Sequence, residues 1–291
     1  MDRLRKPAWL KSEKLGARKA QEIIHCLRKY NLHTVCEGAK CPNQGECFER
    51  GTATFMILGE VCTRNCRFCA VPKTKNELLP PDEKEPAAIA SLCRDLNLKH
   101  IVITTVTRDD LADGGASQFV QTIEAIRKVC KAEVTIEILT SDFNGDLEQV
   151  DKVIAAGPDV FNHNVETIPR LYSEVRPMAD FQRSLQVLKR AKQAAPGILT
   201  KSGFMAGLGE SKEEVVSLLK QLRANDVDIV TIGQYMAPSC HHYPVQEYVH
   251  PDIFDFYRRE GENMGFKFVE SAPLVRSSFH AEKARNFITR F

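Results

Sequence analysis

From residue 52 onward, short apolar runs rich in β-branched residues alternate with longer segments that repeat apolar residues at the helical period. Strands that alternate with helices of this length form parallel βαβ units, whose crossovers are almost always right-handed. The six runs predict an α/β fold, either a partial (β/α)6 barrel or an open doubly wound sheet. The predicted strands are 52–58, 100–106, 133–139, 159–165, 198–205 and 229–236, and the predicted helices are 86–97, 117–130, 146–155, 180–194 and 211–224.

Both ends of the chain extend beyond this repeating core. We expect an N-terminal extension over residues 1–51, the core over 52–250 and a C-terminal extension over 251–291. The first extension contains a predicted helix at 17–30, and the last begins with one at 252–265. No linker rich in Pro, Gly or Ser separates the three parts, so the extensions are expected to pack on the core.

A cysteine-rich loop, CTRNCRFC (62–69), follows the first predicted strand. The loops at the carboxyl ends of parallel strands hold the functional groups in both architectures. Cys62, Cys66 and Cys69 are close enough in sequence for one loop to wrap them around a metal centre. Zinc usually takes four protein ligands, whereas a cubane iron–sulfur cluster held by three thiolates leaves one iron open to a small molecule. An iron–sulfur cluster is therefore favoured, with zinc as the alternative.

The number of cysteines supports metal chemistry. The chain has ten of them, six between Cys36 and Cys69. No apolar run is long enough to span a membrane, and the basic start lacks the apolar stretch of a signal peptide, so we expect a cytoplasmic protein. In a reducing compartment, this many cysteines indicates metal or redox chemistry rather than disulfides.

Basic residues are concentrated at the two ends of the chain. Residues 1–29 hold nine Lys or Arg against three acids, and residues 276–291 hold four against one. Such ends are usually solvated arms, and the alternative is that they attract an acidic partner protein. Nucleic acid is disfavoured, because the sequence has no continuous basic helix and no interleaving of basic and aromatic residues.

A second set of three cysteines lies upstream, in CEGAKCPNQGEC (36–47). Cys36, Cys41 and Cys47 also have no fourth cysteine nearby. Taken alone, this set fits either a structural metal knuckle or a second iron–sulfur cluster. The presence of the first set favours the second cluster.

The two cysteine sets together resemble a known family. C-x3-C-x2-C after a first strand is the signature of the radical S-adenosylmethionine (SAM) superfamily, and an upstream C-x4-C-x5-C with a C-terminal RSS resembles lipoyl synthase. The further matching stretches are RKPAWLK (5–11), CPNQGEC (41–47), RDDLADGGA (108–116), NHNVET (162–167), RLYSEVRP (170–177), KSGFMAGLGE (201–210), GQYMAPS (233–239) and LVRSS (274–278). The resemblance implies the partial (β/α)6 TIM-type barrel of radical SAM enzymes.

The resemblance also implies an activity. Lipoyl synthases are sulfurtransferases that insert two sulfur atoms at the sixth and eighth carbons of an octanoyl chain on a carrier lysine. By resemblance, the first cysteine set holds a 4Fe-4S cluster that binds SAM and cleaves it to a 5′-deoxyadenosyl radical. The second set holds an auxiliary 4Fe-4S cluster, which is the sulfur source. The implied partners are a 2-oxoacid dehydrogenase acyltransferase subunit or glycine cleavage H protein in octanoylated form, and a ferredoxin or flavodoxin as electron donor.

The resemblance implies that Ser278 is the fourth ligand of the auxiliary cluster. A serine oxygen is a weaker partner for this iron than thiolate, which suits a cluster that must come apart at one corner. The alternative is that Ser277 or Ser278 caps a predicted helix at 280–288. Phe279 stands where the family usually has tyrosine, a difference that concerns the geometry around Ser278.

Residues after the second predicted strand are candidates for binding SAM. By resemblance, the methionine part of SAM belongs here, with Thr105 and Asp109 as candidate contacts. Gly114 and Gly115 allow a close approach of the backbone. The alternative is an acidic loop that caps the helix at 117.

Further SAM contacts are expected at the next strands. Glu137, Asn164 and Glu166 offer carboxylate and amide groups that suit ribose hydroxyls. Arg176 is a candidate for binding the SAM carboxylate, because a guanidinium pairs with it in a bidentate manner, and a surface ion pair is the alternative. His163 is expected to be a core histidine rather than a ligand.

Overall fold

The structure is a computed structural model that describes residues 5–10, 17–30, 32–38, 41, 43–50, 52–74, 76 and 78–288. Within these residues the strands form one sheet, and their spatial order is their order along the chain. The strands are β1 (His33–Thr34), β2 (Thr52–Ile57), β3 (His100–Thr105), β4 (Thr135–Leu139), β5 (Val160–Asn162), β6 (Leu199–Ala206), β7 (Ile229–Gln234) and β8 (Phe268–Ser271). β2 to β8 are parallel, and β1 is antiparallel to β2.

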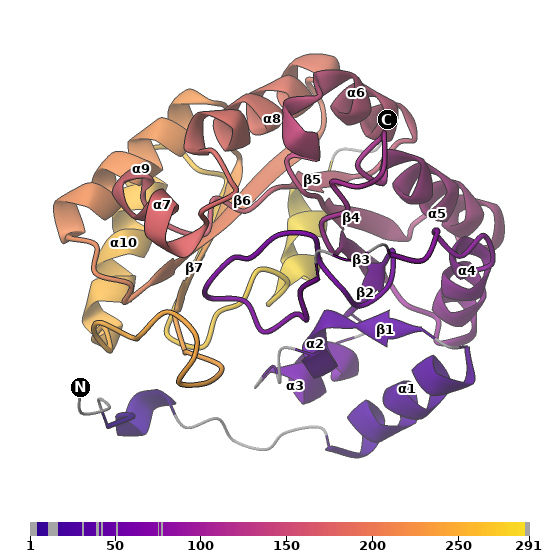
Figure 1. Cartoon of the computed structure of the whole chain (residues 1–291), viewed down its shortest axis with the longest axis horizontal. Coiled ribbons are helices and arrows are strands. Elements are labelled where there is room, and N and C mark those ends of the chain that lie inside the picture. The colour runs from indigo at the N-terminus through magenta and orange to yellow at the C-terminus, as the bar shows by residue number, and fades with distance from the viewer. Residues whose placement is uncertain are drawn as a thin grey trace.

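Helices cover the outer face of this curved sheet (Figure 1). The α-helices are α1 (Ala17–Lys29), α2 (Val35–Gly38), α3 (Gln44–Glu49), α4 (Glu85–Asp95), α5 (Ala116–Val129), α6 (Leu147–Ala155), α7 (Tyr172–Val175), α8 (Phe181–Ala194), α9 (Lys212–Ala224) and α10 (Pro251–Asn263). Short 3-10 helices are η1 (Ala8–Leu10), η2 (Phe143–Gly145), η3 (Pro169–Leu171) and η4 (Ala281–Phe287). A doubly wound sheet would reverse its strand order, so the sequential order confirms the partial barrel.

The predicted βα units agree with the structure, and the start of α9 shows why. Ser211 and Glu214 form the expected capping box, in which the Glu214 N–H donates to Ser211 Oγ at 3.2 Å. The Ser211 N–H donates to a Glu214 carboxylate oxygen at 2.8 Å. These two bonds satisfy backbone donors that a helix start leaves unpaired.

The strands β1 and β8 were not predicted. They form the two edges of the sheet, so among the described residues the sheet stays open. β8 alternates half-buried and buried residues over four positions, and β1 has only two residues. Segments this short form strands because the edge of a neighbouring strand pairs with them. The local pattern of apolar residues does not predict this pairing.

The C-terminal segment, residues 272–288, runs through the interior of the arc of strands (Figure 1). Val275 lies against β7, where a Cβ on Gly233 would come within 2.1 Å of the Val275 carbonyl oxygen. Ala284 of η4 packs against the first residues of three strands, namely Val160, Leu199 and Ile229. The segment therefore fills the barrel from the carboxyl ends of the strands to their amino ends.

The N-terminal extension covers the open side of the arc, where α1 and α3 lie (Figure 1). The Asn43 side chain donates to the Leu274 carbonyl at 2.6 Å, which joins this extension to the C-terminal segment. The Trp9 ring meets the His250 ring edge-on at 5.2 Å, at the start of α10. Both extensions thus pack on the core. No helix within the described residues is long and apolar enough to cross a membrane.

We predict that Gly233→Ala lowers the free energy of unfolding by about 2 kcal/mol, because the new methyl group overlaps the Val275 carbonyl and displaces the C-terminal segment. Urea denaturation measures the change. Gly197→Ala is the matched control, since nothing lies within 4 Å of a Cβ at that position. Equal stabilities of the two variants would contradict the packing of Val275 on β7.

Candidate active site

The loop that carries the first cysteine set leaves β2 at the carboxyl ends of the strands. The loop closes on itself, because the Cys62 N–H donates to the Pro72 carbonyl at 2.9 Å and Lys73 Nζ donates to the Cys66 carbonyl at 2.8 Å. The Arg67 N–H donates to the Val175 carbonyl at 2.8 Å, which fixes the loop to α7. The position of the loop is the one that its sequence predicted.

The first cysteine set gathers in one place. Burial raises the pKa of Cys66, and it raises the pKa of Cys69 to about 11. The charge on Cys62 acts in the same direction on both thiols. All three cysteines lie on this one closed loop, where the Cys69 N–H donates to the Cys66 carbonyl at 3.3 Å. Buried thiolates this close need a nearby cation, so the donor set fits an iron–sulfur cluster.

Arg64 fixes this loop to the barrel. Its guanidinium is buried and donates to both carboxylate oxygens of Asp109 at 2.7 and 2.8 Å, and to Asp142 at 2.6 Å. Burial raises the pKa of Asp142, but Arg64 more than offsets this and lowers it to about 2. Asp109 therefore already has a protein partner, and its contact with SAM stays a prediction.

Three of the predicted SAM contacts lie together beside Cys66, namely Asn164, Glu166 and Arg176. Arg176 is buried, and its Nη1 donates to the Asn164 carbonyl at 3.1 Å and to Tyr172 Oη at 3.0 Å. Its guanidinium opposes the effect of burial on the pKa of both Cys66 and Glu166. The alternative of a surface ion pair for Arg176 is therefore wrong.

A polar atom without a partner points to a ligand at this place. The Nε of Arg176 is buried and has no hydrogen-bond partner within the described part of the chain. A buried guanidinium N–H normally has a hydrogen-bond acceptor, because burying it without one costs free energy. The carboxylate of SAM would supply one. The residues beside Cys66 thus fit SAM by their chemistry.

The loop after β3 shows features of both of its interpretations. Asp113 of this acidic loop binds the start of α5, since its carboxylate accepts from the Ser117 N–H at 2.8 Å. Gly115 has φ 89° and would place a Cβ 2.2 Å from Leu58 Cδ1, so it allows close packing on the loop after β2. Thr105 Oγ1 donates to the adjacent Val106 carbonyl at 2.6 Å. The role of Thr105 in SAM binding stays a prediction.

Glu137 is buried inside the barrel and is saturated by donors. Lys201 Nζ donates to its two oxygens at 2.8 and 3.1 Å, and Asn162 Nδ2 donates at 2.8 Å. Burial raises the pKa of Glu137, but Lys201 and then His100 reverse this and lower it. A ribose contact by Glu137 stays a prediction, and no role for Lys201 was predicted from the sequence.

His163 is a buried core residue, as expected. Its Nδ1 lies 3.0 Å from the Thr140 carbonyl. Burial, with Arg176 nearby, lowers the pKa of His163 to about 4, so the ring is neutral at pH 7.

The second cysteine set lies where α2 and α3 meet β2. The Cys36 N–H donates to Thr34 Oγ1 at 3.2 Å, and Thr34 Oγ1 donates to the Thr54 carbonyl of β2 at 2.7 Å. Burial raises the pKa of Cys36 to about 11 and also raises that of Cys47. The charge on Cys41 adds to both shifts. The Cys41 N–H donates to the Cys36 carbonyl at 3.0 Å, which holds these two cysteines close together.

The two serines of RSS lie in different surroundings. Ser277 Oγ accepts from Asn162 Nδ2 at 3.1 Å and donates to Asn164 Oδ1 at 3.2 Å. The Ser278 hydroxyl has no hydrogen bond to any described residue. The alternative of helix capping is wrong, because η4 begins after His280 and no side chain of the described residues caps it. Asn43, which lies between Cys41 and Cys47, donates to the Leu274 carbonyl at 2.6 Å, which places RSS beside the second set. Arg276 also opposes the effect of burial on the pKa of Cys41.

His242 contacts the first cysteine loop, a contact that was not predicted from the sequence. Its Nε2 lies 3.2 Å from the Cys69 carbonyl, and its Nδ1 lies 2.8 Å from Ser239 Oγ. The next residue, Tyr243, donates its N–H to the Arg67 carbonyl at 2.8 Å. The loop after β7 therefore packs on the cysteine loop. A match to the family pattern was the only available signal for His242.

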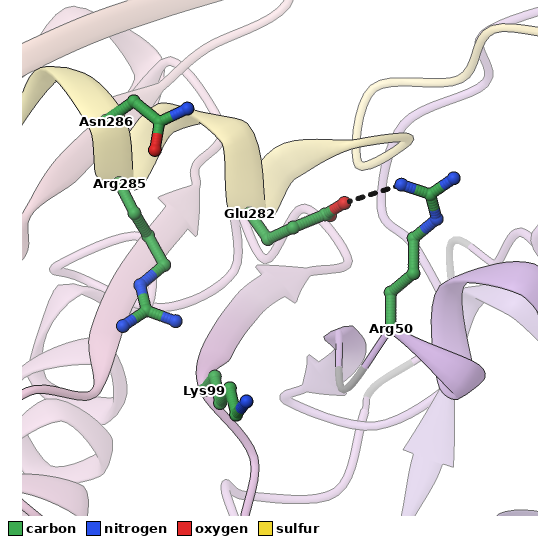
Figure 2. A pocket seen from close by; sticks show the side chains of 5 residues that line it. All are labelled: Arg50, Lys99, Glu282, Arg285 and Asn286. Atoms are coloured by element: carbon green, nitrogen blue, oxygen red, sulfur yellow. Dashed lines mark ion pairs between the residues drawn. The ribbon is translucent and has the colours of Figure 1, made fainter.

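A shallow hollow of about 400 Å³ lies away from these residues, beside the amino end of β3 (Figure 2). It is lined by Arg50, Lys99, Glu282, Arg285 and Asn286. Arg50 and Glu282 form an ion pair at 3.5 Å across it. This pair joins the end of α3 to η4, so the hollow marks a contact between the two extensions.

Comparison with known proteins identifies the class. A model of the radical SAM superfamily matches residues 56–222. Among solved structures, methylornithine synthase (PylB) aligns with a TM-score of 0.57 and 15% identity, over 87% of this chain and 85% of that chain. HydG, a maturase of the FeFe hydrogenase, gives 0.58 and 14%, over 94% and 74%. The chain is a radical SAM protein, and this superfamily uses a 4Fe-4S cluster and SAM.

Two relatives identify the family within this class. A lipoyl synthase of Caldanaerobacter subterraneus subsp. tengcongensis is 54% identical over 283 residues, which are 96% of this chain and 96% of the relative. A lipoyl synthase of Caldicellulosiruptor saccharolyticus is 51% identical over 288 residues, 99% of this chain and 100% of the relative. The chain belongs to the lipoyl synthase family.

We predict that Asp142→Asn destabilises the fold by about 2 kcal/mol at pH 6, because the carboxylate with a lowered pKa no longer pairs with Arg64. A lowered pKa stabilises the fold above the unfolded value of about 3.9, and this contribution is lost as the pH falls toward 2. Urea denaturation at pH 6, 4 and 3 should therefore show a shrinking difference from the wild type. Asp255→Asn, at an exposed pair, is the control. A difference independent of pH would contradict the buried pair.

Proposed function

We propose that this chain inserts two sulfur atoms at the sixth and eighth carbons of a protein-bound octanoyl-lysine. The observation that supports this most is the position of the RSS stretch, which contacts Asn164 of the SAM side and lies beside Cys41 of the second set. One segment thus joins a candidate radical source to a candidate sulfur source. Identities of about one half to lipoyl synthases over nearly the whole chain support the same reaction.

Each group of residues has a part in this proposal. The first set would hold the SAM-binding cluster, and the second set with Ser278 would hold an auxiliary 4Fe-4S cluster. When bound, SAM and the two clusters supply the radical and the sulfur atoms. Arg176 orients the SAM carboxylate through its unpartnered Nε, Arg64 keeps the cysteine loop in place, and the C-terminal segment excludes water from the barrel interior.

The partners follow from this reaction. The substrate is an octanoylated carrier, either a 2-oxoacid dehydrogenase acyltransferase subunit or the glycine cleavage H protein, and the electron donor is a ferredoxin or flavodoxin. Free thiols in both sets suit the cytoplasm. The basic ends of the chain would guide an acidic carrier domain.

We predict that the anaerobically reconstituted wild type binds about eight irons and yields a product two sulfur atoms heavier from an octanoyl-lysyl peptide. Cys36→Ala should bind about four irons and still cleave SAM, because only the auxiliary cluster is lost. Iron and sulfide analysis with product mass spectrometry measures both. Cys240→Ala, at an exposed cysteine, is the control and should match the wild type. Sulfur insertion by Cys36→Ala would overturn the assignment of the second set.

We predict that the KM for an acidic carrier domain rises severalfold between 50 and 500 mM salt, because screening weakens attraction to the basic ends. Steady-state kinetics measure it, and a neutral octanoyl-lysyl peptide is the control, whose KM should stay constant. A KM for the carrier that does not change with salt would count against electrostatic guidance.

A further inference from the structure

A pair of opposite charges lies inside the barrel, and the predicted contact of Glu137 with SAM does not account for its Lys201 partner. Lys201 on β6 is 2% exposed and Glu137 on β4 is fully buried. Their side chains meet at 2.8 Å. Burying two charges costs free energy that their attraction does not always recover, so such a pair is weak evidence for stability alone. The presence of this charged pair inside the barrel therefore needs a further explanation.

A continuous series of hydrogen bonds leads from this pair to the RSS stretch. Asn162 at the end of β5 donates to Glu137 at 2.8 Å and to Ser277 Oγ at 3.1 Å. Ser277 in turn donates to Asn164 at 3.2 Å, in the group beside Cys66. The series runs from the middle of the barrel to the residue before Ser278, and each of these contacts is at normal hydrogen-bond distance.

We propose that Ser277 is a positioning residue, which holds Ser278 at the second cysteine set through Asn162 and the Glu137–Lys201 pair. This inference rests on the proposed function, in which Ser278 is a cluster ligand. Glu137 accepts from both Lys201 and Asn162, so it fixes which way the Asn162 amide points. The Asn162 amide then fixes the Ser277 hydroxyl, and the backbone at Ser277 sets where Ser278 can reach.

The need for such positioning follows from the chemistry of the ligand. A serine oxygen binds iron more weakly than thiolate does, so this ligand gains little from the metal itself. A ligand on a loose segment would also lose conformational entropy on binding. A segment already fixed by hydrogen bonds avoids most of that loss, which makes a weak ligand sufficient. It also keeps the hydroxyl in place when the bond to iron is broken.

The test isolates the auxiliary cluster. A variant with Cys62, Cys66 and Cys69 all replaced by alanine keeps only the second set, and it serves as the parent. Ser277→Ala in this parent is compared with Ser278→Ala, and Ser217→Ala, an exposed serine on α9, is the matched control. The readouts are the rate of iron release to a chelator and the Mössbauer signal of the oxygen-ligated iron.

The expected result separates positioning from simple structure. Ser277→Ala should load the cluster, release iron about tenfold faster than the parent, as expected for a lost hydrogen bond, and weaken the oxygen-ligand signal as Ser278→Ala does. Ser217→Ala should match the parent. Parental release with an intact signal in Ser277→Ala would overturn the inference. A parent that binds no iron would instead refute the proposed function.

A second variant tests the far end of the series and guards against misfolding of the first. Glu137→Gln combined with Lys201→Met removes both charges and leaves neither one unpaired inside the barrel. It should also speed iron release, by a smaller factor, because Asn162 loses its charged acceptor. Lys220→Met, an exposed lysine on α9, is its control. A double variant with the parental rate and signal would remove the charged pair from the proposal.

Discussion

An open parallel sheet leaves two unpaired edges and an interior that must be filled. In this structure the two extensions of the chain pair with one edge and fill the interior. β1 pairs with the exposed edge of β2, and the C-terminal segment fills the interior along β7. Both additions come from the extensions, which also carry the second cysteine set and Ser278. The segments that complete the fold are therefore the segments that complete the candidate site. Substitutions that displace these segments are therefore expected to disturb both the fold and the candidate site.

Buried charge is the second organising feature. Arg64, Arg176 and Lys201 are all buried, the two arginines near the carboxyl ends of the strands and Lys201 inside the barrel. Arg64 and Lys201 have carboxylate partners, whereas Arg176 relies on carbonyl and hydroxyl oxygens, and its Nε has no partner among the residues that the structure describes. The difference distinguishes positions that hold the protein together from a position that is suited to a ligand. Burial raises the pKa of Cys36 and Cys69, and a metal bound at such thiols would have to displace their protons.

The sequence predicted the parts of this structure that depend on local pattern. The period of apolar residues predicted the core strands and their helices, and the position of the first cysteine set in the sequence predicted its loop after β2. The sequence did not predict the pair of Arg64 with Asp109, which are 45 residues apart, or that of Lys201 with Glu137, which are 64 apart. Those contacts depend on the register between strands and on which residues point inward. A lone charged residue within an apolar run indicates a buried charge, but it does not show which residue pairs with it.

The hydrogen bond between Asn43 and Leu274 spans 231 positions of the chain. Contacts so far apart in sequence form late, because closing a long loop costs entropy before any contact compensates for it. During synthesis the first cysteine loop, on the first βα unit, is made and can be surrounded by its neighbours well before residue 274 leaves the ribosome. The second set is complete only after the segment that carries Ser278 has been synthesised. Of the two metal centres proposed for this protein, the auxiliary one is therefore expected to mature after the other.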